Sequence, residues 1–575
     1  MKQNVGLDTE TYKGKVLLIC DSYGRYREID SMDSILDFLT SSKYLKTFNW
    51  FFNLKYDFES IIKWLSKEEL IALYNNRQIE YGKYKIRYLD KKYFSIRLNQ
   101  SSYIFYDINN FIETSLNKAS KIYLGDAKLD IIDSKRLNED INYWKENKKE
   151  IIEYCLKDAL LTKQVADKFW SIMYDTLKFY PYKPYSKGRF SEEYFCAKCF
   201  MPTVNKINTK ILEYGYNSYY GGRFEILKRG YFDTVYMYDI KSAYPYQMQD
   251  LLDINKGRWK KVFDYDEKAD YGFYKCKITV FHPIISPCMQ RIRGLNVYPN
   301  GEFIQFLTQE EIEFILSTYN NIEIEVIDGY CFYATAYFYP LKEEIQKLYE
   351  LKESAPDKQT KLMYKIVLNS LYGKFIQTAG GKTGKLFNPI WASIITANTR
   401  IQLLKYALKN PESIIGFSTD CIHSQIPMNF KQDGSLGSFE LSFKGKGIFL
   451  MSDIYTVWND TADKSRFRGF NKKDDEKEIT KIGEHTVDLK YDLRVILEYL
   501  GDKKVYEYKI ERPIHLGEAL KQVKKLTVDD INIFTTITKK LNINGDKKRL
   551  WKRDFIDGFD AMENSIESEP IVLLE

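Results

Sequence analysis

The sequence predicts a multidomain protein of mixed α/β and α+β class. Its 575 residues are enough for roughly three to five units of about 100–200 residues each. Strand-like and helix-like segments alternate over residues 1–185, whereas strands, turns and helices come in blocks after that. Between these parts, Tyr180–Tyr185 carries Pro181 and Pro184. Two prolines so close together break a helix and suit a joint between domains.

Composition excludes several classes of protein. A hydrophobic fraction of 44% with 29% charged residues is globular, not disordered. No apolar run approaches the roughly 18 residues of a membrane helix, so we expect no membrane association. Charged residues follow the start at once, so we expect no secretory signal. The net charge of +7 permits nucleic-acid binding but does not demonstrate it.

The eight cysteines are scattered, and only Cys196 and Cys199 have C-x-x-C spacing. No second pair follows, so we expect buried thiols in a reducing interior and no zinc site.

The elements of the first part follow from periodicity and breakers. Strands are expected over Lys15–Cys20 and Tyr103–Asp107, and helices over Asp57–Leu65 and Asn142–Trp170.

In the second part, Tyr244-Pro245 closes a predicted strand. Aromatic strand-like pieces with Pro and Gly turns fill residues 260–340. The last 60 or so residues favour helix. The other predicted elements are a strand over Val235–Ile240, a helix over Leu341–Phe375 interrupted near Pro356, a helix over Ile394–Leu408 and a hairpin over Ile414–Ile426.

A set of acidic residues near the start predicts a metal site. If Val5–Leu7 begins a strand, Asp8 and Glu10 point to the same face of it. Two such carboxylates repel each other unless a cation such as Mg²⁺ lies between them. Asp57 falls at a helix start, where an N-cap is the alternative interpretation. Tyr154 and Asp158, four residues apart on a helix, share a face.

In kind and order this set resembles the three exonuclease motifs, D-x-E, N-x-x-F/Y-D and Y-x-x-x-D, of the 3′–5′ proofreading domain of DNA polymerases. The resemblance implies an RNase H-like domain in which Tyr154 orients water. It implies that Asn53 and Tyr56 contact frayed single-stranded DNA. The implied metal ligands are Asp8, Glu10, Asp57 and Asp158.

Asp239-Ile240-Lys241-Ser242-Ala243-Tyr244-Pro245 resembles motif A of family B DNA polymerases, D-x-x-S-L-Y-P, with Ala243 in place of Leu. A carboxylate that leaves a buried strand beside a backbone carbonyl can hold Mg²⁺. The resemblance therefore implies that Asp239 and the carbonyl of Ile240 hold metal, that Ser242 contacts DNA and that Tyr244 lies under the sugar of the nucleotide.

Lys365-Ile366-Val367-Leu368-Asn369-Ser370-Leu371-Tyr372-Gly373 matches motif B, K-x-x-x-N-S-x-Y-G, and is the most specific string in the chain. On a helix Lys365, Asn369 and Tyr372 form one stripe, which Lys361 extends by a turn. The stripe suits an incoming triphosphate and its base, and Gly373 would cap the helix or allow close approach.

Motif C, D-T-D-S, is expected in the predicted hairpin, where the chain has Ser418-Thr419-Asp420-Cys421. The retained Asp420 corresponds to the carboxylate that binds both metals together with motif A. The outer carboxylate is replaced by Ser418, which puts metal affinity and the choice between Mg²⁺ and Mn²⁺ in doubt.

Two shorter matches complete the series. Tyr219-Tyr220-Gly221-Gly222 fits Y-x-G-G/A, which implies contacts of Tyr219, Gly221 and Gly222 with the template strand. Asp453-Ile454-Tyr455 stands where K-x-Y is expected. Tyr455 would support the primer terminus, while the phosphate contact of the missing lysine is lost or supplied elsewhere; Lys444 and Lys446 are near in sequence.

The branch that the chain resembles is the protein-primed family B polymerases of linear phage and plasmid genomes, the phage phi29 type. The first exonuclease carboxylate is residue 8, which leaves no room for the N-terminal domain of cellular replicases. The stretch from motif A to motif B is long enough for an inserted module over residues 261–340 that contacts a terminal protein. Lys128 resembles a short lysine element of this branch that contacts DNA, with a solvated surface lysine as the alternative. The span between Gly373 and Thr396 is too short for a full second insertion.

The resemblance implies a domain order and a set of partners. We expect a monomer that uses two Mg²⁺ per active site, with Mn²⁺ as a substitute, and binds template and primer DNA, dNTPs and a terminal protein in the cytoplasm of a phage-infected or plasmid-bearing bacterium. The right-hand polymerase part would follow the exonuclease domain. The expected domains are an exonuclease over 1–185, palm over 186–260 and 379–515, a terminal-protein insertion over 261–340, fingers over 341–378 and thumb over 516–575.

Three other interpretations stay open. A nucleic-acid-primed family B polymerase would need no terminal protein. A catalytically weakened DNA-binding relic would explain Ser418 and Asp453, although intact Asp239, Asp420 and Lys365 speak against it. A protein that is only an exonuclease would make no use of Asp420.

Overall fold

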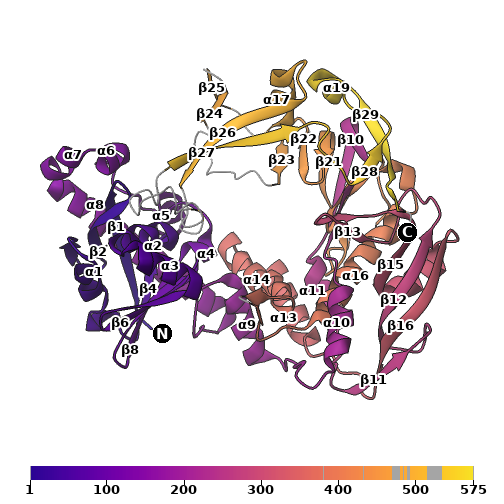
Figure 1. Ribbon diagram of the computed structural model, residues 1–575, viewed down its shortest axis with the longest axis horizontal. Coiled ribbons are helices and arrows are strands. Elements are labelled where there is room, and N and C mark those ends of the chain that lie inside the picture. The colour runs from indigo at the N-terminus through magenta and orange to yellow at the C-terminus, as the bar shows by residue number, and fades with distance from the viewer. Residues whose placement is uncertain are drawn as a thin grey trace. The chain divides into compact units, whose positions relative to one another are not determined.

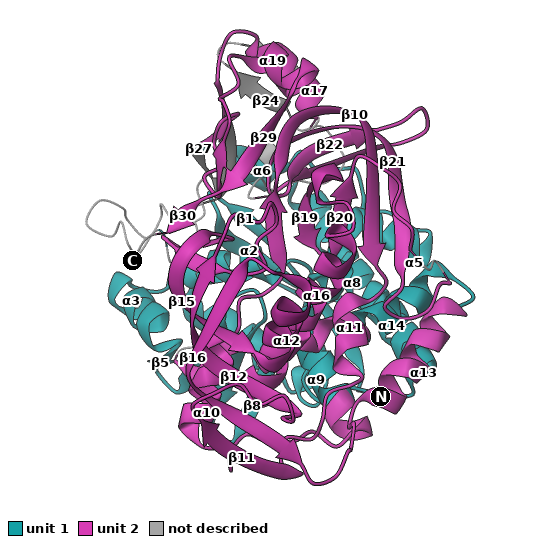
Figure 2. Ribbon diagram, turned by 90° about the vertical axis from the view of Figure 1, so that its right-hand side faces the viewer, with its two compact units in different colours: residues 1–194, 355–367, 510–537 teal, residues 195–354, 368–509, 538–575 magenta. Residues whose placement is uncertain are grey.

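The computed structural model describes residues 2–573 except 380, 431–432, 469–478, 483–484, 489–491, 514–517 and 519–533. The chain divides into two compact units, each assembled from three segments (Figures 1 and 2). The first unit contains residues 1–194, 355–367 and 510–537, and the second contains residues 195–354, 368–509 and 538–575. The sequence placed the first domain boundary at residue 185, nine residues or so before the end of the first segment. None of the described helices is long and apolar enough to cross a membrane.

The first unit is built on an eight-stranded mixed sheet in the order β3-β2-β1-β4-β8-β7-β6-β5. β1 runs antiparallel to β2 and parallel to β4, and β4 runs parallel to β8. The strands are β1 Asn4–Tyr12, β2 Lys15–Asp21, β3 Tyr26–Glu28, β4 Phe48–Phe51, β5 Gln78–Tyr81, β6 Tyr84–Leu89, β7 Tyr93–Leu98 and β8 Ser101–Asp107.

Helices surround this sheet, and the longest of them packs against the central strand β1. The expected helix over Asn142–Trp170 is in fact two helices, because Asn147 leaves helical geometry and its side-chain amide donates to the Tyr143 carbonyl (2.9 Å). The helices are α1 Met32–Leu39, α2 Leu54–Ile61, α3 Lys67–Asn76, α4 Asn109–Ile112, α5 Leu116–Leu124, α6 Ser134–Glu139, α7 Ile141–Glu146, α8 Lys148–Leu177 and α9 Lys187–Lys198, the last of which continues into the second unit.

Gly6 allows α8 to approach β1 closely. A Cβ atom at Gly6 would lie 2.0 Å from the carbonyl oxygen of Ala159 and 2.6 Å from the amide nitrogen of Lys163. We expect Gly6→Ala to push α8 away from β1 and to destabilise the protein by about 3 kcal/mol, since backbone atoms cannot yield as a side chain can. The urea midpoint of unfolding measures this loss. Gly373→Ala, at a helical position with open space around it, is the control and should cost nothing.

The second unit contains a nine-stranded sheet, of which seven strands lie in the order β23-β22-β21-β10-β20-β19-β9. The first four of these strands are labelled in Figure 1. Strand β29 pairs with the free end of β10 and with β28. The strands are β9 Arg223–Ile226, β10 Lys228–Ile240, β19 Ile414–Thr419, β20 Cys421–Ser424, β21 Phe439–Met451, β22 Ile454–Trp458, β23 Asp463–Phe467, β28 Arg549–Trp551 and β29 Ser565–Pro570. The expected strand over Val235–Ile240 and the expected hairpin over Ile414–Ile426 are confirmed.

A second sheet of five strands, in the order β11-β16-β12-β15-β30, occupies the stretch predicted to be an insertion. Its aromatic strand-like pieces are confirmed as strands. They are β11 Gly257–Val262, β12 Tyr271–Val280, β15 Asn300–Thr308, β16 Ile322–Ala334 and β30 Val572–Leu573, with the small hairpin β13 Gln290–Ile292 and β14 Leu295–Val297 between them in sequence.

The helices predicted after residue 341 are confirmed, including the interruption near Pro356. Gly373 lies within a short helix of four residues, so its expected role as a cap is wrong. No described atom lies within 4 Å of its would-be Cβ, and the expected close approach stays a prediction. The helices are α10 Thr209–Asn217, α11 Ala243–Met248, α12 Gln309–Thr318, α13 Lys342–Glu353, α14 Lys358–Ser370, α15 Tyr372–Phe375, α16 Pro389–Ala407, α17 Leu493–Leu500 and α19 Gly558–Glu563.

The expected helical bias of the last 60 or so residues is wrong for the described part of that stretch. Helix α19 has only six residues, while β27 Phe534–Asn542, β28, β29 and β30 are strands. β29 and β30 add to sheets formed by distant parts of the chain. Pairing with partners that are remote in sequence overrides local propensity, which is all that the sequence prediction could use. A further small sheet has the order β25-β24-β26-β27, with β24 Ile479–Ile482, β25 His485–Asp488 and β26 Val505–Pro513.

Candidate functional site

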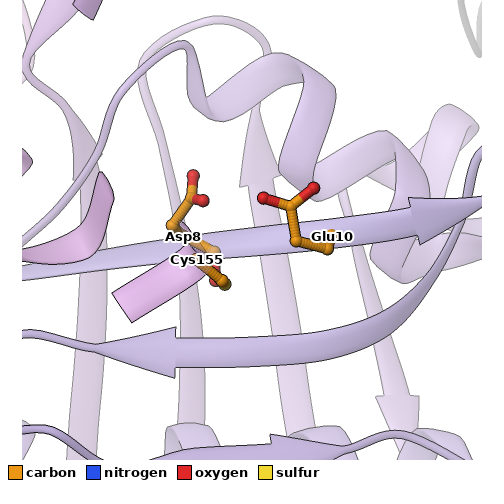
Figure 3. Close-up of side chains that lie close together, drawn as sticks. All are labelled: Asp8, Glu10 and Cys155. Atoms are coloured by element: carbon orange, nitrogen blue, oxygen red, sulfur yellow. The ribbon is translucent and has the colours of Figure 1, made fainter. Parts of the chain in front are cut away.

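The first candidate site is a cluster of acidic side chains in the first unit. Asp8 and Glu10 lie two residues apart on β1 and present both carboxyl groups on the same side of the strand, as predicted (Figure 3). Ligand atoms of these two residues and of Cys155 from α8 all lie within 4.8 Å of one another. The Cys155 thiol donates to the Asp8 carbonyl (3.6 Å). Cys155 therefore packs under β1, while the carboxyl groups form the polar face of the site.

The neighbouring helix α2 supplies Asp57, whose carboxylate accepts a hydrogen bond from the Thr9 hydroxyl (2.6 Å). Asp57 lies inside α2 and is not its N-cap, so the alternative interpretation as a cap is wrong. The N-cap is Asn53, which has a left-handed backbone (φ 68°). Its N–H donates to the Asp107 carboxylate (3.0 Å). The Tyr56 hydroxyl is hydrogen bonded to Thr11 (2.7 Å), while the residue is 39% exposed. The contacts of Asn53 and Tyr56 with DNA stay predictions.

Helix α8 adds Tyr154 and Asp158 one turn apart, on the same face as predicted. Lys128 forms an ion pair with Asp158, and its ammonium group lies 4.8 Å from the centre of the Tyr154 ring. The alternative interpretation of Lys128 as a solvated surface lysine is therefore wrong. We refer below to Asp8, Glu10, Asp57 and Asp158 as the carboxylate cluster.

The environment of the carboxylate cluster raises the pKa values of its carboxyl groups. Burial raises the pKa of Glu10 to about 8, and the Asp158 charge adds to this. Burial also raises the pKa of Asp57 to about 7. The pKa of Asp8 lies well above its usual value because of burial, then Asp158 and Glu10. Lys128 opposes these shifts but cannot balance four carboxylates.

The donor set of the carboxylate cluster fits a hard divalent cation. Its members offer carboxylate oxygens, the ligands that Mg²⁺ and Mn²⁺ prefer. One oxygen of Asp158 (Oδ1) is buried with no hydrogen-bond partner among the described residues, although its other oxygen pairs with Lys128. A buried acceptor without a partner costs free energy, which a bound cation would recover.

These pKa shifts predict how stability depends on pH when metal is absent. A raised pKa means that the folded protein binds more protons than the unfolded one, so stability falls as the pH rises from the usual value of 4.5 through about 8 for Glu10. We expect the thermal midpoint in EDTA to drop over this range and the drop to be smaller in Glu10→Gln. Thermal melts between pH 5 and 8.5 measure it. Glu68→Gln, at an exposed position on α3, should leave the slope unchanged; an equal effect of both variants would contradict the assignment.

The second candidate site, in the second unit, forms where β10 ends beside the β19–β20 hairpin. Asp239 is paired with Cys421 in the β10–β20 ladder, and the N–H of Ile240 donates to the Asp420 carbonyl (2.9 Å). Burial raises the pKa of Asp420 to about 6, and the charge of Asp239 contributes next. Asp239 thus lies on β10, and Asp420, far from it in sequence, lies in the turn between β19 and β20 beside that strand, so the two carboxylates repel each other.

The Tyr-Tyr-Gly-Gly stretch packs against this hairpin. A Cβ atom at Gly222 would lie 2.8 Å from Cγ2 of Thr419 and 3.2 Å from the Tyr244 hydroxyl, and Gly221 has a positive φ of 81°. Thr419 itself has a φ of 61°, which is rare for a β-branched residue. Such strain persists only where the surroundings impose it and is typical of functional sites. It sets the direction in which Asp420 leaves the hairpin.

Three tyrosines lie together beside this strained turn. The rings of Tyr244 and Tyr372 are stacked with their centres 4.3 Å apart, and the Tyr219 and Tyr372 hydroxyls are hydrogen bonded (2.8 Å). Burial, followed by the charge of Asp420, raises the pKa of Tyr244. Ser242 has a φ of 49°, and its hydroxyl accepts from the Lys352 ammonium group (2.9 Å). Motifs A, B and Y-x-G-G/A therefore meet at one place in the second unit.

Helix α14 carries the rest of motif B. Lys361, Lys365 and Asn369 are exposed at four-residue intervals, while the residues between Lys365 and Asn369 are buried. These three residues of the predicted stripe thus lie on one exposed face of α14, whereas Tyr372, which the prediction placed on the same stripe, lies in the separate helix α15. Lys361 and Lys365 belong to the first unit and Asn369 to the second.

Ser418, which replaces the outer carboxylate of motif C, is part of a buried and uncharged hydrogen-bonded pair. The Ser418 hydroxyl is hydrogen bonded to Nε2 of His423 (3.1 Å). Burial lowers the pKa of His423 to about 3, so its imidazole is neutral. Sequence reasoning did not single out His423, although it is one of only four histidines in the chain.

Two further residues that the sequence analysis did not single out support the site. The Arg400 guanidinium donates to the Gly221 carbonyl (2.6 Å) and pairs with Glu311 (2.6 Å). The side chains of Arg400 and Glu311 are both buried, so this ion pair holds the backbone at Gly221 in place. No local motif marks either residue, because the contact joins segments far apart in the chain.

The stretch at K-x-Y is also buried. Tyr455 is 2% exposed, with its ring 5.4 Å from His423 and 5.1 Å from Phe449. Asp453, likewise 2% exposed, has a φ of 60°. Contact of Tyr455 with a primer stays a prediction.

Comparison with known proteins finds relatives in sequence and similar structures in fold. Residues 125–385 match the family described as DNA polymerase type B, organellar and viral. The DNA polymerase of Acidianus bottle-shaped virus (isolate Italy/Pozzuoli) is 27% identical over 338 residues, which is 55% of this chain and 47% of the viral protein. A probable DNA polymerase of Agaricus bitorquis is 27% identical over 290 residues, 46% of this chain and 35% of that protein. The matched part thus spans less than half of each relative.

Residues 125–385, less than half of the chain, are thus similar to type B DNA polymerases of the organellar and viral kind. The fold is similar to that of phi29 DNA polymerase complexed with primer-template DNA and incoming nucleotides, with a TM-score of 0.66 and 17% identity over 94% of this chain and 100% of that one. The structure of phi29 DNA polymerase with single-stranded DNA is similar over 82% of this chain, with a TM-score of 0.57 and 17% identity over 93% of that chain.

Proposed function

We propose that the protein is a template-directed DNA polymerase with a 3′–5′ proofreading exonuclease. The observation that carries the proposal is the presence of two separate acidic sites, the carboxylate cluster in the first unit and Asp239 with Asp420 in the second. The first unit would be the RNase H-like exonuclease domain. The second would hold the palm, fingers and thumb of a right-hand polymerase.

In the polymerase site a primer hydroxyl attacks the α-phosphate of a dNTP, a new P–O bond forms and pyrophosphate leaves. Asp239, the Ile240 carbonyl and Asp420 would hold Mg²⁺, or Mn²⁺ in its place, and the metal supplies charge neutralisation and a lowered pKa of the attacking hydroxyl. Tyr244 would lie under the sugar, with Tyr372 stacked on it. Lys361, Lys365 and Asn369 would receive the triphosphate and base.

In the exonuclease site water attacks the terminal phosphodiester. The carboxylate cluster would hold the metals, which supply an activated water and a stabilised leaving oxygen. Tyr154 would orient the water, and Lys128 beside it would offset part of the negative charge of the site. Asn53 and Tyr56 would hold the frayed strand.

One assay with a 5′-labelled primer on a longer template tests both activities. With dNTPs and Mg²⁺ we expect lengthening of the primer, and without dNTPs we expect its shortening. Repeating both arms in Mn²⁺ shows whether Ser418 has altered the metal preference. A protein that shortens but never lengthens the primer would be an exonuclease only, and one that binds DNA without changing it in either metal would be a relic.

We further propose that synthesis starts on a hydroxyl of a terminal protein. The five-stranded sheet formed mainly by residues 257–334, inserted between motifs A and B, supports this as a surface for such a partner. The expected setting is a monomer in the cytoplasm of an infected or plasmid-bearing bacterium. Incorporation of a labelled dNMP into terminal protein without an oligonucleotide is the test. Initiation only from an oligonucleotide would favour the nucleic-acid-primed alternative.

The short span after motif B predicts weak strand displacement. Between the end of α15 and the start of α16, the described residues form only two-residue strands, β17 Thr378–Ala379 and β18 Lys382–Thr383. A hairpin this small offers little surface to hold a strand or to part a duplex. We expect extension from a nick in duplex DNA, without helper protein, to stop after short products. Extension on single-stranded template is the control, and long products from the nick would contradict the prediction.

A further inference from the structure

A stripe of three cations lies on the edge strand of the nine-stranded sheet. Lys464, Arg466 and Arg468 alternate along β23 and just beyond it, and all three are exposed. Phe467, between two of them, is buried. Alternate residues of a strand share a face and lie about 7 Å apart. We refer to these three residues as the β23 basic stripe.

The stripe is anchored by the buried Asp453. Nε of Arg466 lies 3.3 Å from Oδ1 of Asp453, and Nη1 of Arg468 lies 3.8 Å from its Oδ2. The carboxylate is 1% exposed, whereas the two arginine side chains are 52% and 60% exposed. Two cations share one carboxylate, so positive charge remains, and the guanidinium groups still face solvent.

Contacts within the second unit connect this stripe to the turn that carries Asp420. Arg466 stands opposite Tyr455 in the β22–β23 ladder. The Tyr455 ring packs on His423, and His423 is hydrogen bonded to Ser418, two residues before Asp420. The charge of Arg466 also counteracts the rise in the pKa of Asp420, which burial and Asp239 cause. Arg466 is thus close enough to act on the charges at the proposed site of synthesis.

We infer that the β23 basic stripe binds consecutive phosphates of the primer strand next to its reactive end, with Arg466 as the central positioning residue. The inference rests on the proposed polymerase function. Asp453 repels phosphate, but as an anchor it orients Arg466 and Arg468, whose planar forks match phosphate oxygens. The positive charge that would bind the primer phosphates therefore comes from β23, the strand that pairs with β22. Its side chains are distant in sequence from motif C.

The test compares Arg466→Ala, Arg466→Lys and Lys464→Ala with the wild type. Fluorescence anisotropy gives the Kd for primer–template at several salt concentrations, and steady-state extension gives kcat and KM for primer and for dNTP. For Arg466→Ala we expect roughly tenfold weaker binding and a salt-dependence slope smaller by about one phosphate contact. The KM for dNTP should stay unchanged. Arg466→Lys should restore most of the slope, because it keeps the charge.

Arg27→Ala is the matched control, because Arg27 is also an exposed arginine on an edge strand, β3, and also lies beside a carboxylate, that of Asp37. It should bind primer–template as the wild type does. Unchanged affinity and slope in Arg466→Ala, or equal losses in Arg27→Ala, would overturn the inference. A lower thermal midpoint with an unchanged slope would also overturn it, since that is what a purely structural partner of Asp453 would give. If Arg466→Ala does not fold, the salt-dependence slopes of primer–template binding by Arg466→Lys and Lys464→Ala test the inference in its place. Failure of the wild type itself to extend a primer would refute the proposed function instead.

Discussion

Asp420→Asn is expected to reduce nucleotide incorporation at least about 10³-fold, roughly 4 kcal/mol of activation free energy, while 3′–5′ degradation continues at the wild-type rate. The amide keeps the shape of the side chain but removes the charge that would hold the metals with Asp239. It also removes the repulsion between the two carboxylates. In the wild type this repulsion, after burial, raises the pKa of Asp420. The thermal midpoint should therefore be unchanged or higher. Single-nucleotide incorporation and a thermal melt measure the two effects.

Asp233→Asn is the control for this variant, because Asp233 is an exposed carboxylate on the same strand as Asp239. It should incorporate nucleotides at the wild-type rate. Incorporation by Asp420→Asn within tenfold of the wild type would show that Asp420 is not a metal ligand, and the assignment of the second site would have to be abandoned.

The double substitution Asp8→Ala with Glu10→Ala should give the complementary result. Degradation of a single-stranded primer should fall at least about 10³-fold, since both carboxylates on the shared face of β1 are lost. Incorporation of the correct nucleotide should be unaffected, and mismatched primer ends should persist. Because burial opposes ionisation of both groups, the variant should be more stable than the wild type at pH 8 without metal.

A double variant of exposed acids in the same unit, Glu68→Ala with Glu80→Ala, controls for the loss of charge. It should degrade DNA normally. Loss of both degradation and synthesis in the Asp8 and Glu10 variant, with normal stability, would contradict the division of the two activities between the two sites.

Much of the candidate sites could be predicted because their residues follow local rules. The same-face placement of Asp8 and Glu10 needs only the period of a strand, and the exposed stripe of Lys361, Lys365 and Asn369 needs only the period of a helix. Tyr154 and Asp158 share a face for the same reason. In each case one element and its pattern carry the whole prediction.

The rest depends on contacts between distant segments, which no local pattern encodes. From the sequence alone Lys128 could be a surface lysine, and only the fold shows that it pairs with Asp158 of α8. His423 gains its role only because the hairpin folds its imidazole onto Ser418. The C-terminal strands β29 and β30 form because β10 and β15 offer them open edges. Their own sequences are weak signals, since β29 has one aliphatic residue and ends in Pro570, and β30 has only two residues.

The interleaved order of the two units has a consequence for biosynthesis. The buried Ser191 hydroxyl donates to the carbonyl of Val367 (2.7 Å), so the end of the first segment needs a partner made some 175 residues later. A ribosome must therefore translate strand β10 and most of the five-stranded sheet before the first unit can close. The amino-terminal segment cannot reach its final state while it emerges, as independent domains commonly do. A fragment that ends at residue 194 should accordingly be less stable than the same residues in the whole chain.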